Sequence, residues 1–484
     1  MNVRLVEVMV MGRWAVLGLL GLAQFMLIVD ITVVQVALPT IGTELKLGRE
    51  ALTWVVTTYT LVFGGLMVLG GRLADAFGAR RTLLAGLGVF AAASLVCGVA
   101  GDGATLIAGR AFQGVGAALM SPSALAVITR TYHGELRNRA LGVWGAIGGS
   151  GAAVGVLAGG LLTAGPGWSW VFYVNVPIAL AVLAVLPRLV ERDEAVLPRL
   201  VGRDEAGASG RRVDVPGAVT VTLATGLLIY GLVGAGDAGW GAFSTLAALG
   251  GAVLGYGLFV LVERSVRTPL MRAETMARRA VVSGTFVMLA ATGLLLGLFF
   301  VSSLYLQHVL GYDALATGLI FLPVAVAITL GAHLGGRLVG KVGGRPVALV
   351  SFALTAAGAA LMMRISPDAS VWTTLVPGFV LAAFGIGPAF VTATTTTMAN
   401  VPAGEAGVAS GVINTFHELG GSIGVAVVST MAAASLAPGA VGIEGFTGAL
   451  LLCVIVAAVA AVVSSVLVPA GKPSGVTVGH GHGH

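Results

Sequence analysis

Apolar stretches of about twenty residues follow one another along almost the whole length of this 484-residue chain. A helix needs about that many apolar residues to cross the hydrocarbon core of a bilayer. The stretches lack the polar–apolar alternation of a membrane β-barrel, so each predicts a helix and the fold class is an all-α polytopic membrane protein. We place fourteen membrane-spanning helices at 13–38, 50–71, 81–101, 104–128, 139–163, 168–187, 215–234, 241–262, 280–304, 313–336, 346–365, 372–398, 408–434 and 446–469.

The composition agrees with this interpretation. The chain is 57% hydrophobic and only 10% charged, too few polar residues to cover a soluble protein of this length. Its 73 glycines suit membrane helices that approach one another closely. The first apolar stretch is too long for a cleavable signal peptide and leads into further spans. Cys97 and Cys453 both fall inside apolar stretches, which argues against a disulfide framework.

The basic residues lie at the ends of apolar stretches, which argues against nucleic-acid binding and predicts the orientation in the membrane. With the N-terminus in the cytoplasm, only Lys46, Arg49 and Arg364 fall on the outer side, and Arg110 lies within a span. All other lysines and arginines are then cytoplasmic, as the positive-inside rule requires. Fourteen is even, so we expect a multi-pass protein of the cell membrane with both termini in the cytoplasm.

Two segments between spans are similar in sequence. GGRLADAFGARR at 70–81 is echoed by GGRLVGKVGGRP at 335–346, and QGVGAALMS at 113–121 is echoed more weakly by FGIGPAFVT at 384–392. Such a repeat predicts two six-helix bundles with a binding site between them.

The repeat divides the chain into bundles, linkers and a tail. A tandem duplication, 184–194 and 195–205, carries proline and mixed charge and is interpreted as a lengthened cytoplasmic linker. The predicted parts are an N-terminal bundle at 1–187, a linker at 188–214, two inserted transmembrane helices at 215–262, a linker at 263–279, a C-terminal bundle at 280–470 and a disordered His-containing tail at 471–484.

Five motifs in order carry a family resemblance. They are VDITVVQVALP (29–39), GGRLADAFGARR (70–81), LIAGRAFQGVGAA (106–118), WSWVFYVNVPI (168–178) and VASGVINTFHELGGSIGVA (408–426). With them the chain resembles the major facilitator superfamily, specifically its 14-helix drug:proton antiporter branch, over essentially its whole length. The resemblance implies a secondary transporter that exports a small amphipathic drug or antibiotic, driven by the proton gradient without a cofactor.

In the family, the segment at 70–81 resembles a cytoplasmic latch that holds the outward-open state through charge pairs. Glycines suit tight helix ends or close approach there. Asp75 is the acidic member, and the second copy has Gly340 in its place. The alternative is that Arg80 and Arg81 only anchor the topology. The residues of this predicted gating loop are Gly71, Arg72, Asp75, Gly78, Arg80 and Arg81.

Asp30 lies inside the first span, where a charged carboxylate costs about 3 kcal/mol unless it is paired, protonated or in contact with a polar cavity. A buried carboxyl can carry a proton near neutral pH or attract a cationic substrate. The alternative is a role in helix packing near the outer face. Gln35 stands where the family usually has Asn, which affects the details of any substrate pocket.

Arg110 lies within the fourth span and resembles the family's arginine there, which is thought to take part in proton coupling. A buried arginine requires a partner, so we expect a backbone carbonyl or a carboxylate beside it. Gln113, three residues later, lies on the same helix face. The alternative is a purely structural role for Arg110.

The fifth span contains GAIGGSGAAVGVLAGG at 145–160, a small-residue face for close helix contact. Antiporters of the family have a Gly-Pro pair in this motif, whereas this chain has Gly155 and Val156, which weakens the case for antiport over other modes of transport. The predicted helix-packing residues are Gly151, Gly155, Gly159 and Gly160.

The thirteenth span places His417 and Glu418 in apolar sequence, one turn after Asn414. Adjacent helical residues point about 100° apart, so we expect at most one of the two to face the cavity. Glu418 is the candidate for a second protonation or cation site after Asp30. His417 and His333 are interpreted as packing residues.

Several functional classes lack their signals. There is no GxxxxGK[ST] motif for ATP-driven transport, and the only metal-binding pattern is the HGHGH tail at 480–484. An enzyme would need a cluster of catalytic groups, and a sensor would need a soluble output domain. We therefore predict a monomeric secondary transporter in the lipid bilayer, not an enzyme, with a small-molecule substrate and protons as its partners and no metal, cofactor or nucleic acid. The alternative is an importer or uniporter of the same fold for a nutrient.

Overall fold

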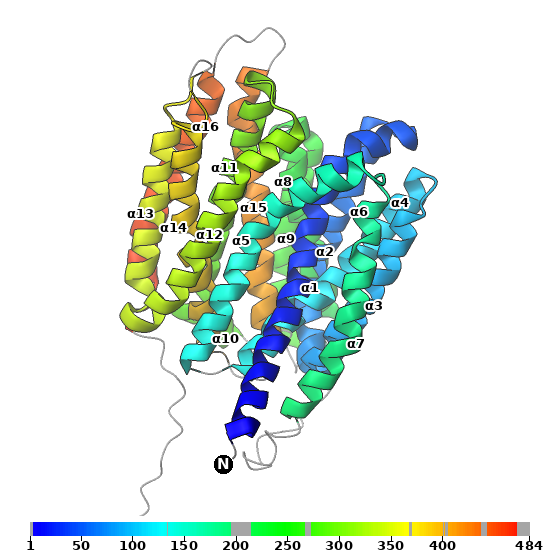
Figure 1. Ribbon diagram of the computed structural model, residues 1–484, viewed down its shortest axis with the longest axis vertical. Helices are drawn as coiled ribbons and strands as arrows, with labels where there is room; N and C mark the ends of the chain where they lie inside the picture. Colours follow the sequence, from blue (N-terminus) through cyan, green and yellow to red (C-terminus); the bar gives the residue numbers. More distant parts are fainter. Residues whose placement is uncertain are drawn as a thin grey trace, which may run out of the picture.

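A computed structural model describes residues 3–132, 134–194, 214–266, 273–366, 370–399, 401, 405–436 and 443–471. The regular structure in these ranges is helical (Figure 1). The first half contains α1 (Val3–Glu44), α2 (Arg49–Phe77), α3 (Ala79–Gly98), α4 (Gly103–Thr131), α5 (Gly134–Ala164), α6 (Trp170–Tyr173) and α7 (Asn175–Glu194).

Two further helices lie between the first half and the second half of the chain. The inserted helices are α8 (Val215–Ala238) and α9 (Phe243–Ser265). The second half contains α10 (Ala273–Met276), α11 (Arg279–Leu304), a π-helical turn η3 (Tyr305–Val309), α12 (Ala314–Val342), α13 (Gly344–Met362), α14 (Leu375–Met398), α15 (Ala406–Leu436) and α16 (Glu444–Leu467).

The predicted all-α membrane fold is confirmed. Within the described residues, twelve helices are long and apolar enough to cross a membrane. Helices α5 and α15 have 31 residues each, which at 1.5 Å per residue is also enough for a crossing. Together they match the fourteen predicted spans, with α6 and α7 forming the sixth.

The segment at 70–81 is helical where we expected a loop. Helix α2 continues to Phe77 and α3 begins at Ala79, so Gly78 alone separates them, with φ of 96°. Gly343 separates α12 from α13 in the same way, with φ of 88°. Glycine adopts this backbone conformation without steric cost. The charged residues therefore extend α2 beyond its apolar part instead of forming a loop.

Aspartates fix the beginning of three helices. Asp102, Asp214 and Asp313 each accept a hydrogen bond from the backbone N–H three residues later, at 2.9, 3.0 and 2.7 Å. This contact satisfies a backbone donor that the helix itself leaves free. The hydrogen bonds from Thr105 hold the pKa of Asp102 below its ordinary value.

The first copy of the tandem duplication, 184–194, belongs to α7 and not to a linker. Leu186 is buried, and Leu183 and Leu189 pack on the same core, which explains why this segment stays helical. The second copy, at 195–205, lies outside the described residues, as do most of the predicted linker at 188–214 and nearly all of the tail at 471–484. Part of the linker predicted at 263–279 is helical, in α9 and α10.

Two pairs of helices make the most extensive contacts between the halves: α5 packs on α12 (Figure 1), and α2 packs on α15. Each contact relies on glycine. A Cβ at Gly71 would overlap the backbone of Gly407, and a Cβ at Gly142 would lie 3.3 Å from the Ala332 carbonyl oxygen. The halves therefore meet closely at the end of the molecule where α2 meets α3, which we call the Asp75 end.

Within the first half, the glycine motif of α5 faces α1. A Cβ at Gly151 would lie 2.6 Å from Ile28, and Gly155 and Gly159 face the next two turns of α1. Gly160, which follows Gly159, is half-buried. Close approach at these glycines fixes the position of α1, the helix that contains Asp30.

Candidate functional site

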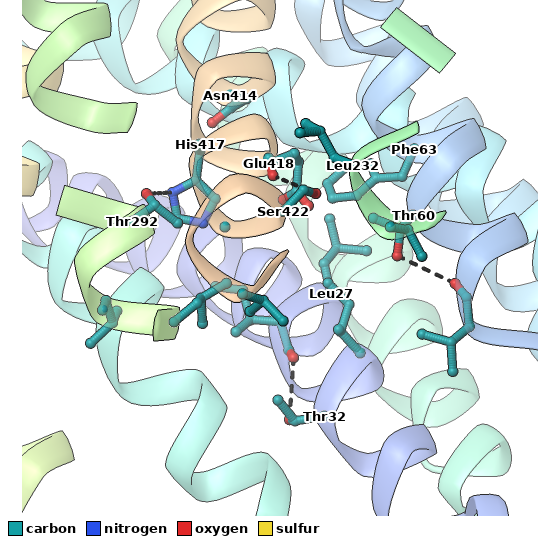
Figure 2. Close-up of a pocket in the computed structure, with 18 of the residues that line it drawn as sticks. Leu27, Thr32, Thr60, Phe63, Leu232, Thr292, Asn414, His417, Glu418 and Ser422 are labelled. Carbon is teal, nitrogen blue, oxygen red and sulfur yellow. Dashed lines mark hydrogen bonds between the residues drawn. The ribbon is translucent and has the colours of Figure 1, made fainter. Parts of the chain in front are cut away.

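A cavity of about 400 Å³ lies between the halves and is lined by α1, α2, α4, α8, α11 and α15 (Figure 2). Much of its wall is apolar, with Leu27, Phe63 and Leu232 among the contributors. Among the described residues that line it, Glu418 is the one carboxyl, and none is Lys or Arg. The polar side chains around it are Gln24, Thr32, Gln35, Thr60, Ser121, Thr292, Asn414, His417, Glu418, Ser422 and Ser429.

Both His417 and Glu418 line the cavity, so the expectation that at most one would do so is wrong. His417 points towards α11, where Nδ1 lies 3.0 Å from the Thr292 hydroxyl (Figure 2). Glu418 lies on the side of α2, since its Cβ is 3.7 Å from the position of a Cβ at Gly64. The cavity wraps around α15 far enough that two side chains about 100° apart both reach it.

Asp30 belongs to a separate buried network and is only 1% exposed. Its Oδ2 accepts a hydrogen bond from Arg110 Nη1 at 2.5 Å. Its Oδ1 accepts from Asn175 Nδ2 at 2.8 Å and from Gln113 Nε2 at 3.2 Å. Groups from α4 and α7 thus surround the carboxylate of α1, which compensates for its removal from water.

Arg110 is held on three further sides. Its Nε donates to the Val55 carbonyl at 3.1 Å, and its Nη1 donates to Gln113 Oε1 at 2.8 Å. The guanidinium carbon lies 4.1 Å from the centroid of the Tyr59 ring, a cation–π contact. The predicted partners, a backbone carbonyl and a carboxylate, are both present.

Sequence reasoning missed three members of this network: Tyr59, Ser94 and Asn175. Ser94 accepts a hydrogen bond from Gln113 Nε2 at 2.8 Å. Asn175 had a usable signal, because it is a lone amide in the apolar run at 168–178 and begins α7 directly after the break that follows α6. Tyr59 had none, since nothing in its local sequence separates a ring over a guanidinium from a ring in a core.

The buried network and the cavity are distinct but linked through α2. Asp30, Arg110 and Gln113 do not contribute to the cavity wall, whereas the exposed Gln35 does. The Tyr59 ring packs on the ring of Phe63 with 5.5 Å between centroids, and Phe63 lines the cavity. One aromatic pair therefore connects the buried ion pair to the space between the halves.

Asp75 joins α2 to the second half through backbone groups. Its carboxylate accepts from the N–H groups of Gly407 and Val408, both at 2.9 Å, in the first turn of α15. The positive end of the α15 dipole thus meets the negative charge. The charge pair is with Arg130 of α4, at 2.8 Å, and lies within the first half.

The arginines of the predicted gating loop have different surroundings. Arg80 donates to the Pro187 carbonyl of α7 at 3.3 Å. Arg81 is exposed, which is consistent with a topological role, and Arg72 is half-buried. Within the described contacts, Asp75 is the member of this segment whose side chain bonds to the other half.

A second polar contact joins the halves at the same end. Arg137 of α5 donates to the carbonyl of Met398, in the last turn of α14. The cavity lies on the far side of both contacts, because its lining residues on α15 run from Asn414 to Ser429, away from Gly407. The halves are therefore closed at the Asp75 end, with the cavity towards the opposite end.

The family model described as Major Facilitator Superfamily matches residues 20–425. The chain belongs to the major facilitator superfamily. A puromycin resistance protein of Streptomyces alboniger is 40% identical over 88% of this chain and 83% of its own length. A cephamycin export protein of Amycolatopsis lactamdurans is 36% identical over 84% of this chain and 83% of its own length. A tetracenomycin C resistance and export protein of Streptomyces glaucescens is 34% identical over 87% of this chain and 76% of its own length.

Solved structures of the superfamily show the same fold. A proton:xylose symporter superposes with a TM-score of 0.65 at 15% identity, covering 96% of this chain and 97% of its own. A human organic anion transporter superposes with a TM-score of 0.61 over 91% and 98%. The superfamily consists of membrane transporters, so this chain is a transporter of a cell membrane. In the described part of the chain, no three His, Cys, Asp or Glu side chains form a group that could bind a metal.

Proposed function

We propose that this transporter exports a small amphipathic drug or antibiotic in exchange for protons. The observation that carries the proposal is the cavity between the halves, largely apolar and with Glu418 as its carboxyl. An apolar wall with one negative charge suits an amphipathic molecule that bears a positive charge. Relatives named for antibiotic resistance and export support the direction of transport.

In this proposal the Asp75 end is cytoplasmic, as are both termini. The excess of basic residues assigned to that side supports the orientation. The cavity then lies towards the outside, and the two halves alternate about it as a monomer. No cofactor is involved, because the proton gradient drives the exchange.

The two buried carboxyls have different tasks in this proposal. Glu418 binds either a proton or the substrate cation, so that each displaces the other. Asp30 is too enclosed to meet the substrate in this conformation and senses protons through its ion pair. Protonation of Asp30 removes the charge that Arg110 neutralises, which loosens the contacts among α1, α4 and α7.

The first test measures uptake of a lipophilic monocation, tetraphenylphosphonium, into everted membrane vesicles with an imposed pH gradient. We expect an acidic interior to drive uptake by the wild type, and uptake that ignores the gradient contradicts proton antiport. Glu418→Gln is expected to lose about tenfold in affinity for the cation, because the counter-charge disappears. Glu418→Asp and Glu444→Gln, the latter an exposed carboxyl of α16, serve as matched controls.

The same vesicles test Asp30. We expect Asp30→Asn to insert normally and to bind the cation, but to lose the response to the pH gradient. Normal gradient-driven transport in this variant would remove Asp30 from the coupling mechanism.

Vesicles of both orientations test the importer alternative, which is favoured by the Gly155–Val156 pair in place of Gly-Pro. Faster uptake in right-side-out than in everted vesicles would support an importer.

A further inference from the structure

The inserted helix α8 takes part in the cavity wall. Leu232 and Val233 line the cavity together with Glu418. Figure 2 shows Leu232 beside Glu418. Leu232 is only 5% exposed, and it packs with Leu419, the residue next to Glu418. The apolar side of the space beside the carboxyl is thus built partly by a helix that lies outside the two six-helix bundles.

Helix α8 is anchored on α2. Ile229 lies over Gly64, where a Cβ would collide with its side chain. One residue later, Tyr230 stacks on Trp54 with centroids 6.1 Å apart and 21° between the rings. These contacts lie one turn or less from Leu232, so they fix the position of the cavity-lining turn.

Helix α8 is also anchored on α15. Ile229 and Leu232 form an apolar cluster with Leu419, against which Ile423 packs. Beyond the end of α8, Trp240 Nε1 donates a hydrogen bond of 3.0 Å to the Thr430 hydroxyl. Helix α8 thus contacts both halves.

Helix α8 lies alongside the contact between α2 and α15. Near the Asp75 end the two helices touch directly, with Gly71 on Gly407 and Gly411 on Met67. At the level of Glu418, Ile229 and Leu232 of α8 contact both helices. Helix α8 is therefore the wall of the cavity on this side.

Helix α9 covers the other side of this wall. The Thr225 hydroxyl of α8 and the Tyr256 hydroxyl of α9 are 2.8 Å apart, and Gly255 allows close contact with Ala224. On α9, Val253 and Leu254 are more than 70% exposed, as expected for side chains that face lipid. The α8–α9 pair thus separates the cavity from the bilayer.

We propose that α8 is the wall that selects substrates by size. Leu232 and Val233 limit the width available to the apolar body of an amphipathic cation whose charge is held at Glu418. This rests on the proposed function and adds the dimension that decides between substrates. A smaller side chain at Leu232 or Val233 widens the cavity and admits a bulkier cation. A larger side chain narrows the cavity and excludes a bulky cation more strongly than a slim one.

The test compares equilibrium binding of two monocations to the purified full-length protein: the bulky tetraphenylphosphonium and the slim benzyltrimethylammonium. We expect Val233→Trp to weaken tetraphenylphosphonium about tenfold and benzyltrimethylammonium less than about threefold. Leu232→Ala shifts the ratio of the two affinities the other way. Leu223→Trp is the matched control, since Leu223 lies on the same helix and is 61% exposed.

Two results would contradict size selection by α8: an unchanged ratio of the two affinities in both cavity variants, or the same change of this ratio in the control. If Val233→Trp does not fold, Val233→Leu makes the same comparison with a smaller expected change. If the wild type binds neither cation, the proposed function is contradicted, and so is size selection by α8, which rests on it. If the wild type binds both cations but the cavity variants leave the ratio of their affinities unaltered, only size selection by α8 is contradicted.

Discussion

At the scale of single residues, the charged groups inside the membrane part have two kinds of surroundings. Asp30 and Arg110 do not line the cavity; they form an ion pair, and each makes further hydrogen bonds to neighbouring groups. Glu418 lies in the cavity wall instead. In the mechanism we propose, the paired carboxyl of Asp30 senses protons and the carboxyl of Glu418 in the cavity wall binds a cation.

Removing one partner of the buried pair leaves the other charge without compensation. We expect Arg110→Gln to lower the free energy of unfolding by about 3–5 kcal/mol, because the Asp30 carboxylate stays buried. The double variant with Asp30→Asn removes both charges and is expected to recover most of that loss, although not proton coupling. Thermal unfolding in detergent measures both, with Arg81→Gln as the exposed control. A double variant no more stable than Arg110→Gln would show that the pair is not the cause.

The network was only partly predictable at this scale. That Asp30 and Arg110 need partners follows from the cost of charge in an apolar run. That they partner each other depends on how α1, α4 and α7 pack, and the spacing of residues along the chain contains no such distance. His417 and Glu418 show the same limit, because helical periodicity gives the angle between them but not the width of the cavity.

At the scale of helices, two residues of the first half bind the facing ends of α14 and α15 in the second half. Asp75 meets the N-terminus of α15, and Arg137 meets the C-terminal carbonyl of Met398 in α14. A negative charge at a helix N-terminus and a positive charge at a helix C-terminus both complement the helix dipoles. The two contacts therefore clamp the α14–α15 connection with opposite charges and hold the Asp75 end closed.

We expect both contacts of this clamp, that of Asp75 and that of Arg137, to stabilise the closed arrangement. We expect Asp75→Ala and Arg137→Ala each to cost about 1 kcal/mol in the closed arrangement, as for loss of a helix cap, which is about a fivefold change in population. A thiol introduced by Asn414→Cys should then react faster with an impermeant maleimide added at the Asp75 end. The native Cys97 and Cys453 are buried, so their background labelling is low. Equal labelling rates in both variants and in the wild type would exclude the clamp.

At the scale of the whole molecule, the two halves repeat in backbone but not in charge. Gly78 and Gly343 make the same turn, yet Asp75 has Gly340 as its counterpart. Hydropathy and the repeat predicted the fourteen helices, because both follow from local composition. The placement of α8 beside Glu418 did not follow, since an inserted pair of helices carries no sign of which side of the bundle it joins.

Closure at the Asp75 end depends on the absence of side chains at the contact between halves. A Cβ at Gly71 or Gly407 would overlap the backbone of the other helix, so valine there forces the halves apart. Spin labels at Arg81→Cys and Lys341→Cys, both exposed and on opposite halves, report the separation at this end. We expect Gly407→Val to shift the distance distribution to longer values and to slow transport. Gly88→Val, on α3 with open space around its Cβ, is expected to change neither. A distance distribution in Gly407→Val identical to that of the wild type would mean that the closed end tolerates a side chain at this contact. The two halves would then not need the close glycine contact in order to alternate.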